Sequence, residues 1–558
     1  KDNLGLGYGW ADNYHTKLER FGASAAITLP GGAGIHFVLS ADGKFYSDPG
    51  SFYQLERQGD GYRLSHKNGT VYLYDAEGQI QNISRLDGNV INFTHADGRI
   101  ATVSNRAGNF TFGYNGNGNL TSITDSVGRV TTLSYDGDYL VSVTNTDGDA
   151  LRYTYDENGY LTTVENFKGE VYVQNEYDEI GRVVKQYVKD DDSYTFTYDE
   201  EARVNTCMGE SGKLDKIRYD ALGRIVEHTT NSGTKTVTYD DLNRRTSESD
   251  WLGNITYYEY DDIGNVTKIT YPDGLSEQFT YNSDNQVVTF TDRNGDTVSY
   301  TYNGAHRLSS ITDGRGNKTT YQYDGDGNLT AAVDGEGAKT TYTYDAAGNC
   351  LTETNALGQV THYAYDEQGR LSTATYPDGS TVSYEYTTAG KLVKVTDAAG
   401  SVQTYTVDGN GFNTSQSDWL GNVTSYAYNT QNQLTSVTDP MGATTTYSYD
   451  EVGNLVLTTD ANRNSVSYTY DAEGQMISMT DGMGNTWRYE YDGNGRLVKT
   501  TDPMGGVVST AYDKVGRTDS VTDANGGVTT YIYDGVGNTT SVKDALGKST
   551  QNVYDANG

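Results

Sequence analysis

A tyrosine motif returns every 21 residues along most of this chain. The tyrosine is usually followed by aspartate and, three positions after the aspartate, by glycine; the spacing holds without exception from Tyr239 to Tyr554, with Val407 in one tyrosine position. From Tyr114 to Tyr239 the spacing is 20 to 22 residues. Representative structural repeat positions are Tyr323, Tyr344, Tyr365, Tyr449, Tyr470, Tyr491, Gly348, Gly369, Gly453 and Gly474. A fixed period of this length predicts a tandem-repeat architecture.

Each unit has the pattern of a β-hairpin. In the segment 444–449, Tyr447 and Tyr449 alternate with Thr446 and Ser448, as expected for a strand with two different faces. The segment 450–453 has Asp first and Gly fourth, which is typical of a tight turn, and a second strand is predicted over 455–459. A second turn, such as 439–442, connects successive units. No 3.6-residue periodicity persists, so the predicted fold class is all-β: a long antiparallel ribbon of hairpins.

The turn glycine is replaced in some units, and the substitutes indicate the backbone conformation. They are mostly Asn243, Asn285, Asn432 and His306. Because these residue types tolerate a left-handed backbone, the position is predicted to have positive φ. Ala202 breaks this rule, and distorted hairpins or longer loops are expected between about residues 160 and 235, where the repeats are least regular.

The second strand of the unit has an unusual apolar spacing. Leu434 and Val437 are three residues apart, which would place them on opposite faces of a regular strand. Two explanations remain open: a β-bulge lies between the two residues, or both faces of the sheet are partly covered.

The length of the ribbon predicts that it encloses a volume. About 23 two-stranded units at roughly 4.8 Å per strand would extend for about 220 Å. A twisted sheet of that length coils or closes on itself. A spiral about 35 Å across would complete about two turns and would place one turn against the next, which covers the margins of the sheet. We therefore predict a hollow shell.

Composition excludes several classes of function. The chain has 41 Lys and Arg against 75 Asp and Glu, for a net charge of −34, so binding to nucleic acid or to anionic lipid is not expected. No apolar run is long enough to span a membrane. The two cysteines, Cys207 and Cys350, fit no disulfide framework and no metal or redox motif. The seven histidines form no ligand pattern, and no nucleophile elbow occurs. We predict no catalytic, cofactor-binding or metal site and no cofactor.

Aromatic residues are the remaining candidate contact sites. Rows of tyrosines pack across neighbouring strands or stack sugars. Trp251 and Trp419 both lie at turn tips, within two copies of the sequence Asp-Trp-Leu-Gly-Asn. Each tryptophan either packs over the rim of the ribbon onto an adjacent turn or marks a contact with a partner.

The run "GQVTHYAYDEQGRLSTATYPDGS" at residues 358–380 and its copies resemble the YD repeats of the bacterial Rhs (rearrangement hot spot) family, which also occur in TcC toxin components and in teneurins. The opening "NLGLGYGWADNYHTKLER" resembles the segment that introduces the YD region. The resemblance divides the chain into a lead-in β segment, residues 1–70, and a YD-repeat shell, residues 71–558. In that family the repeats form a hollow β-cocoon that holds a C-terminal toxin, and a closing region in many members cleaves the toxin free as an aspartyl protease.

The resemblance implies a non-enzymatic shell that sequesters a toxic domain until delivery. The toxin cargo and the closing region are absent, so the chain is expected to be a fragment, and any protease or toxin activity would lie beyond Gly558. The two Asp-Pro-Met-Gly turns, at 439–442 and 502–505, are interpreted as ordinary turns. Further expected partners are a secretion apparatus or an immunity protein, and the expected location is secreted or at the bacterial cell surface, with an export signal outside this sequence. The alternative is a cell-surface adhesin or carbohydrate-binding repeat protein; an enzyme built on the repeats is the least favoured, because repeats supply no unique constellation of groups.

Overall fold

The computed structural model describes residues 6, 10, 14–47, 50–188 and 193–557, and all of their regular structure is β. The 53 strands follow one another without a helix among these residues. Each strand from β5 (Tyr53–Gln58) to β53 (Ser549–Gln551) pairs antiparallel with the next strand in the sequence, which makes one ribbon of 49 strands. The predicted fold class is confirmed.

A separate four-stranded sheet precedes the ribbon. It consists of β1 (Lys17–Phe21), β2 (Ser24–Thr28), β3 (Gly34–Leu39) and β4 (Phe45–Ser47), paired in that order. The ribbon begins with β5, which pairs with β6 (Gly61–His66), and β6 pairs with β7 (Val71–Tyr74). The domain boundary predicted between residues 70 and 71 remains a prediction; β5 and β6 precede it and continue into the ribbon.

The unit has the geometry that its sequence predicts. Strands β43 (Thr444–Tyr449) and β44 (Leu455–Thr459) flank the turn 450–453, in which the amide of Gly453 donates to the carbonyl of Asp450 at 3.1 Å. We call this the YD turn, and the turn between units, such as 439–442, the linker turn. Four glycines in the predicted turn position, Gly348, Gly369, Gly453 and Gly474, have φ between 74° and 94°.

The non-glycine substitutes confirm the predicted backbone conformation. Asn243, Asn285, His306 and Asn432 have φ between 59° and 61°, inside the left-handed region. The unit with Ala202 keeps the turn by a shift of one residue, because Arg203 takes the positive φ of 54°. The adjacent strands β19 (Ser193–Asp199) and β20 (Val204–Gly209) pair without the register shift that most other hairpins have. This hairpin is therefore irregular, as its sequence predicts.

Arg463 occupies the glycine position of the linker turn 460–463 with φ of 67°. A side chain in this conformation is strained, and arginine has no short polar group to compensate locally. Arg463→Gly is therefore expected to stabilise the protein by about 0.5–1 kcal/mol, measured as a higher urea midpoint. Asn432→Gly is the matched control and should gain less, because asparagine tolerates this conformation. An unchanged or lower midpoint for Arg463→Gly would contradict the prediction.

A β-bulge accounts for the three-residue apolar spacing. In β42 (Leu434–Thr438), Leu434 pairs with Tyr428 but Ser436 pairs with Ala427, so Thr435 is an extra residue. The extra residue returns Val437 to the face of Leu434. Of the two explanations that the sequence leaves open, the bulge is the one that the structure contains.

The N-terminal segment shows which face of the ribbon is concave. Thr16 bonds the hydroxyl of Tyr74 in β7 at 2.7 Å, and Trp10 Nε1 donates to the hydroxyl of Tyr155 in β15 (Ala150–Tyr155) at 3.0 Å. Both contacts are made to the tyrosine face. Trp10 and Tyr14 also pack against one hydrophobic cluster whose side chains extend along the ribbon from Leu64 to Val164. Because a single cluster reaches this many strands of one ribbon only from its concave side, the tyrosine face is inside.

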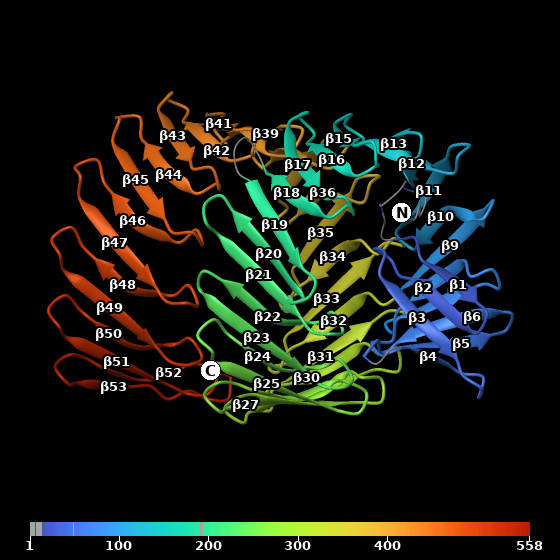
Figure 1. Cartoon of the computed structure of the whole chain (residues 1–558), viewed down its shortest axis with the longest axis horizontal. Coiled ribbons are helices and arrows are strands. Elements are labelled where there is room, and N and C mark those ends of the chain that lie inside the picture. The colour runs from blue at the N-terminus through green and yellow to red at the C-terminus, as the bar shows by residue number, and fades with distance from the viewer. Residues whose placement is uncertain (1–5, 7–9, 11–13, 48–49, 189–192, 558) are drawn as a thin grey trace.

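The ribbon coils through two turns. Contacts between turns join residues 197 to 220 positions apart near the start of the spiral and 240 to 244 positions apart over most of its length. Figure 1 shows the first coil with β1–β4 beside it at one end and the last strands, β45–β53, at the opposite end. The two turns agree with the coil predicted from ribbon length.

The interior beyond the first coil is not packed as a core. Most fully buried hydrophobic side chains lie between Leu18 and Val164; past Val164 the described residues add Ala331, Ala374 and Val395. The accessible surface is 30015 Å². A compact protein of 61.0 kDa would expose about 19,600 Å². This excess of about one half is expected of a wall with two exposed faces.

Candidate functional site: the concave wall and the seam

The repeated tyrosine closes a gap that the bulge leaves in the sheet. Pairing between β42 and β43 stops at Ser436 and Thr446, so the carbonyl of Leu434 lies beyond the ladder. The hydroxyl of Tyr449 donates to this carbonyl at 2.8 Å. Burial raises the pKa of Tyr449, so the hydroxyl remains a donor at neutral pH. The tyrosine is therefore needed for its hydroxyl as well as for its ring.

The same bond recurs along the wall. It joins each of the following tyrosines to a carbonyl 14 to 16 residues upstream: Tyr114, Tyr135, Tyr155, Tyr177, Tyr198, Tyr239, Tyr260, Tyr281, Tyr302, Tyr344, Tyr365, Tyr386, Tyr449, Tyr470, Tyr491, Tyr512 and Tyr554. Tyr323 is half-buried, and burial raises its pKa too. These positions line the concave face.

Removal of one hydroxyl tests this role. Tyr449→Phe is expected to destabilise the protein by about 1 kcal/mol, because the carbonyl of Leu434 loses its donor. Val407→Tyr is expected to stabilise the protein. Val407 occupies the tyrosine position, and valine has no hydroxyl to donate to the carbonyl of Leu392. Urea midpoints of both variants measure the effect. If both urea midpoints shift in the same direction, the hydrogen bond of the hydroxyl does not explain why tyrosine stabilises this position.

The convex face of the ribbon has a different chemistry. Threonine and serine hydroxyls pair there across neighbouring strands, as in Thr343 with Thr352 at 2.6 Å and Thr406 with Ser415 at 2.6 Å. Thr343 and Thr406 are exposed. The wall thus presents rings inward and small hydroxyls outward.

Successive coils meet along a seam between two kinds of turn. Linker turns of the segment from Lys67 to Arg315 contact YD turns of the segment from Gly264 to Asn557. Lys168 forms an ion pair with Asp408 at 2.9 Å, and Arg315 forms one with Asp555 at 2.9 Å. The seam therefore joins the coils through turn-to-turn polar contacts.

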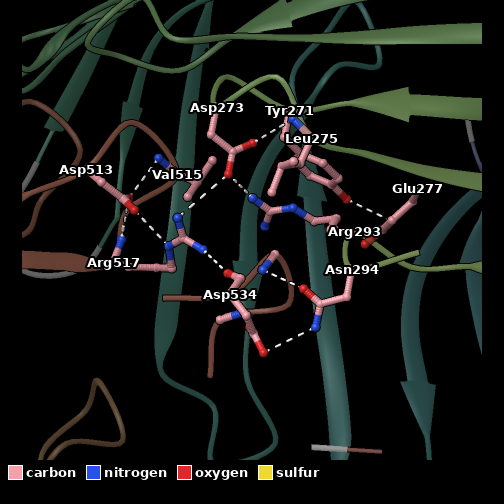
Figure 2. A network of polar contacts seen from close by, with 12 residues as sticks. Tyr271, Asp273, Leu275, Glu277, Arg293, Asn294, Asp513, Val515, Arg517 and Asp534 are labelled. Atoms are coloured by element: carbon pink, nitrogen blue, oxygen red, sulfur yellow. Dashed lines mark hydrogen bonds and ion pairs between the residues drawn. The ribbon is translucent and has the colours of Figure 1, made fainter. Parts of the chain in front are cut away.

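Figure 2 shows one part of this seam. Asn294, in a linker turn, accepts a hydrogen bond from the amide of Gly535 at 2.6 Å and donates to Asp534 at 3.2 Å. Asp273 is shared by Arg293 of its own coil and, at 3.7 Å, Arg517 of the next coil. Because Asp273, Asp513 and Asp534 each have a cationic or amide partner, the two strongly acidic coils approach one another with these carboxylates paired.

Tyr271 lies beside this network, and its burial changes the pKa of its phenol. The Arg293 guanidinium lies over its ring, with 4.7 Å between the guanidinium carbon and the ring centre. Burial and then a hydrogen bond to Glu277 raise the pKa of Tyr271 to about 12. The phenol is therefore neutral and serves as a donor, not as an acid or base.

A cleft of about 620 Å³ interrupts the seam. It lies between residues 104–129 of the first coil and the YD turns near Asp345 and Asp366 of the second. Tyr14 of the N-terminal segment and Phe110 are among its lining residues, with ring centres 6.4 Å apart. The N-terminal segment thus contributes to the wall of the cleft.

Comparison with known protein families identifies the family of this chain. A family model described as RHS Repeat matches residues 281–402, 428–507 and 512–550 in overlapping units, and a model described as Teneurin YD-shell matches residues 98–238. Together the two models cover more than half of the chain. The chain belongs to the RHS/YD-repeat family. Its wall and seam are accordingly those of a shell-type scaffold.

Individual relatives of this RHS/YD-repeat chain are distant. A curated protein described as "Probable deoxyribonuclease RhsB", from Dickeya dadantii (strain 3937), is 28% identical over 155 residues, which is 27% of this chain and 11% of that protein. Among solved structures, TcdB2-TccC3-Cdc42 matches with a TM-score of 0.52, and TcdB2-TccC3 without its hypervariable C-terminal region with 0.51. Both are 15% identical, covering 88% of this chain and 34% of theirs. These structures share the fold.

The two tryptophans of the RHS/YD-repeat chain lie in different surroundings. Trp251 is half-buried at the seam, 5.1 Å from the ring of His228 and under Lys235 at 4.6 Å. Trp419 is 41% exposed, in a linker turn of the second coil. The structure does not bring the two together. The seam contacts themselves were missed by sequence analysis, since their partners lie about 240 residues apart.

The described part of the chain contains no group of three His, Cys, Asp or Glu side chains placed to hold a metal ion. Neither does it contain a helix with the length and hydropathy to cross a membrane. Cys207 and Cys350 are both free and half-buried, and burial raises the pKa of each thiol.

Proposed function

We propose that this chain is the wall of a shell that sequesters a toxic polypeptide until delivery. The observation that carries the proposal is the concave tyrosine face, together with an accessible surface about half again that of a compact protein of this mass. A wall of this shape separates a guest polypeptide from solvent and from proteases. The curated relative described as a probable deoxyribonuclease supports a cargo of this general kind.

The proposal includes a role for this chain without catalysis of its own. The wall groups that we describe are repeated many times in near-identical surroundings, whereas catalysis needs one unique arrangement. The cargo, its release and any enzymatic activity would belong to other segments. The chain spans 11% of the curated relative and 34% of the solved chains that it matches, so those proteins have room for such segments. Secretion or display at the bacterial surface is part of the same proposal.

Electron cryo-microscopy of the natural gene product that contains this sequence tests the proposal. We expect density from a separate polypeptide segment inside the tyrosine-lined wall, and protection of that segment from added protease until the wall is unfolded. A wall with an empty interior, or a gene product that ends with these repeats, would contradict containment. Binding of glycans to the outer face in the absence of a guest would favour the adhesin alternative instead.

A further inference from the structure

Three asparagines of the seam are followed directly by glycine: Asn294, Asn410 and Asn494. The side-chain oxygen Oδ1 of each accepts a hydrogen bond from a backbone amide of the adjacent coil. The donors are, in the same order, Gly535 at 2.6 Å, Phe167 at 3.1 Å and Trp251 at 3.1 Å. The same pair of residue types therefore holds the coils together at three places along the seam.

Two of these asparagines also donate to a carboxylate. Asn494 Nδ2 donates to Asp250 Oδ2 at 2.7 Å, and Asn294 Nδ2 donates to Asp534 Oδ2 at 3.2 Å. Burial by itself would raise the pKa of Asp250, but hydrogen bonds from Asn254 and Asn494 outweigh it, and the pKa is lowered. An ionised carboxylate therefore lies directly against the side-chain amide of Asn494.

An asparagine that precedes glycine is open to attack by its own backbone, because glycine has no Cβ to hinder the approach. The amide nitrogen of the glycine forms a bond to Cγ of the asparagine. The bond from Cγ to Nδ2 breaks, and Nδ2 leaves as ammonia with the proton of the glycine amide. Water then opens the five-membered imide at either carbonyl by breaking one carbon–nitrogen bond of the ring. The product is aspartate or isoaspartate, and no oxidant or reductant takes part.

The closed seam blocks this reaction at Asn494. The attack requires the side chain to turn toward the amide of Gly495, which would break both hydrogen bonds to the adjacent coil. That amide also donates to the carbonyl of Asp492 at 2.9 Å inside its own turn. The backbone is confined as well, because a Cβ on Gly493 would lie 2.8 Å from the carbonyl oxygen of Ser232. The reaction therefore requires the coils to separate locally.

A copy of the same turn lies away from the seam, at residues 115–118. Its sequence Asn-Gly-Asn-Gly differs from the Asp-Gly-Asn-Gly of residues 492–495 only at the first position. The amide of Gly118 donates to the carbonyl of Asn115 at 2.9 Å, so the turn bond is the same. Asn117 is exposed, and its side chain is not hydrogen-bonded to another of the described residues. Asn117 therefore reports deamidation in this turn without the seam.

Deamidation changes the contact with Asp250 from attractive to repulsive. The carboxylate formed from Asn494 lacks the donor Nδ2 and places a second negative charge against Asp250, and like charges at contact distance repel one another. Asn410 loses the bond that its Nδ2 donates to Asn432 Oδ1 at 2.9 Å. Isoaspartate in addition adds one carbon to the backbone of a four-residue turn, which changes the shape of the turn.

We propose that Asn294, Asn410 and Asn494 are deamidation sites that the closed seam protects, and that their deamidation after the coils separate prevents the seam from closing again. The seam is then a latch that opens once. Its chemistry requires only water, and it is independent of what the shell contains.

Mass spectrometry that resolves each asparagine, on the intact chain in mildly alkaline buffer, tests the protection. We expect Asn117 to deamidate at least about tenfold faster than the three seam asparagines, because these wait for local opening. Gly493→Ala should raise the rate at Asn494 toward that at Asn117, since the added Cβ forces the turn away from Ser232. Gly116→Ala is the matched control: a Cβ there meets no atom within 4 Å, so the rate at Asn117 should stay the same. Equal rates at Asn117 and Asn494 in the natural chain, or no acceleration by Gly493→Ala, would overturn the proposal.

The effect on closure is measured separately. Asn494→Asp introduces the carboxylate without the extra backbone carbon, and hydrogen exchange in the turns 250–253 and 492–495 should become at least about tenfold faster. Asn117→Asp makes the same change away from the seam and should leave the exchange of residues 250–253 as it is. Unchanged exchange there in Asn494→Asp would show that deamidation does not keep the seam open. Neither experiment involves a guest polypeptide, so a negative result leaves the containment proposal untouched.

Discussion

Phe37→Ala is expected to destabilise the N-terminal part of the protein by about 3–5 kcal/mol. Phe37 lies in β3 and is 1% exposed, in the cluster that includes Ile27 and Leu64. Removal of its ring leaves a cavity between the four-stranded sheet and the first coil, where neighbouring side chains are held by strands and relax only partly. Urea unfolding followed by tyrosine fluorescence, with hydrogen exchange of β1–β4, measures the loss.

The matched control is Phe290→Ala, in β28 (Val287–Thr291). Phe290 packs on Phe279 with ring centres 5.2 Å apart but remains half-exposed on the wall. Because less apolar surface is removed from solvent there, the substitution should cost about half as much or less. Equal costs at the two positions would show that the wall at Phe290 is packed as tightly as the N-terminal core, which would count against an open interior.

Gly535→Ala is expected to open the seam near the end of the spiral, at a cost of about 1–3 kcal/mol. A Cβ there would lie 2.4 Å from the carbonyl oxygen of Arg293, and backbone cannot rotate away as a side chain can. The hydrogen bond from the amide of Gly535 to Asn294 should be lost. Hydrogen exchange should become faster in the turns 292–295 and 534–537, with little change in the strands β5–β15 at the start of the ribbon.

Gly325→Ala is the control for this prediction. Gly325 has the same position in its YD turn, and a Cβ on it would have no neighbour within 4 Å. This variant should therefore have nearly the stability of the natural chain. If the two variants have the same stability and exchange rates, the close approach of the coils at Gly535 does not hold in solution.

Much of the fold could be predicted because its determinants lie within one unit. The turn glycine and its substitutes Asn243 and His306 indicate a local steric requirement for positive φ. In the structure, the turn glycines, Asn243 and His306 all have positive φ. The spacing of Leu434 and Val437 indicates either a bulge or two partly covered faces, and the structure contains the bulge, at Thr435 between them. The role of Tyr449 was only half foreseen: its place on one face follows from alternation, but the carbonyl that it bonds depends on where the bulge ends the ladder.

The sequence by itself determined the hairpin, its turns and the need for a coiled ribbon, because sterics and hydrogen bonds within 21 residues settle them. Only the tertiary structure decided which turns face one another, since the meeting of Trp251 with Asn494 depends on bend and twist summed over more than twenty strands. The identical turns at Trp251 and Trp419 make the distinction plain. Local sequence builds the same shape twice, and the place in the spiral leaves one covered and the other open.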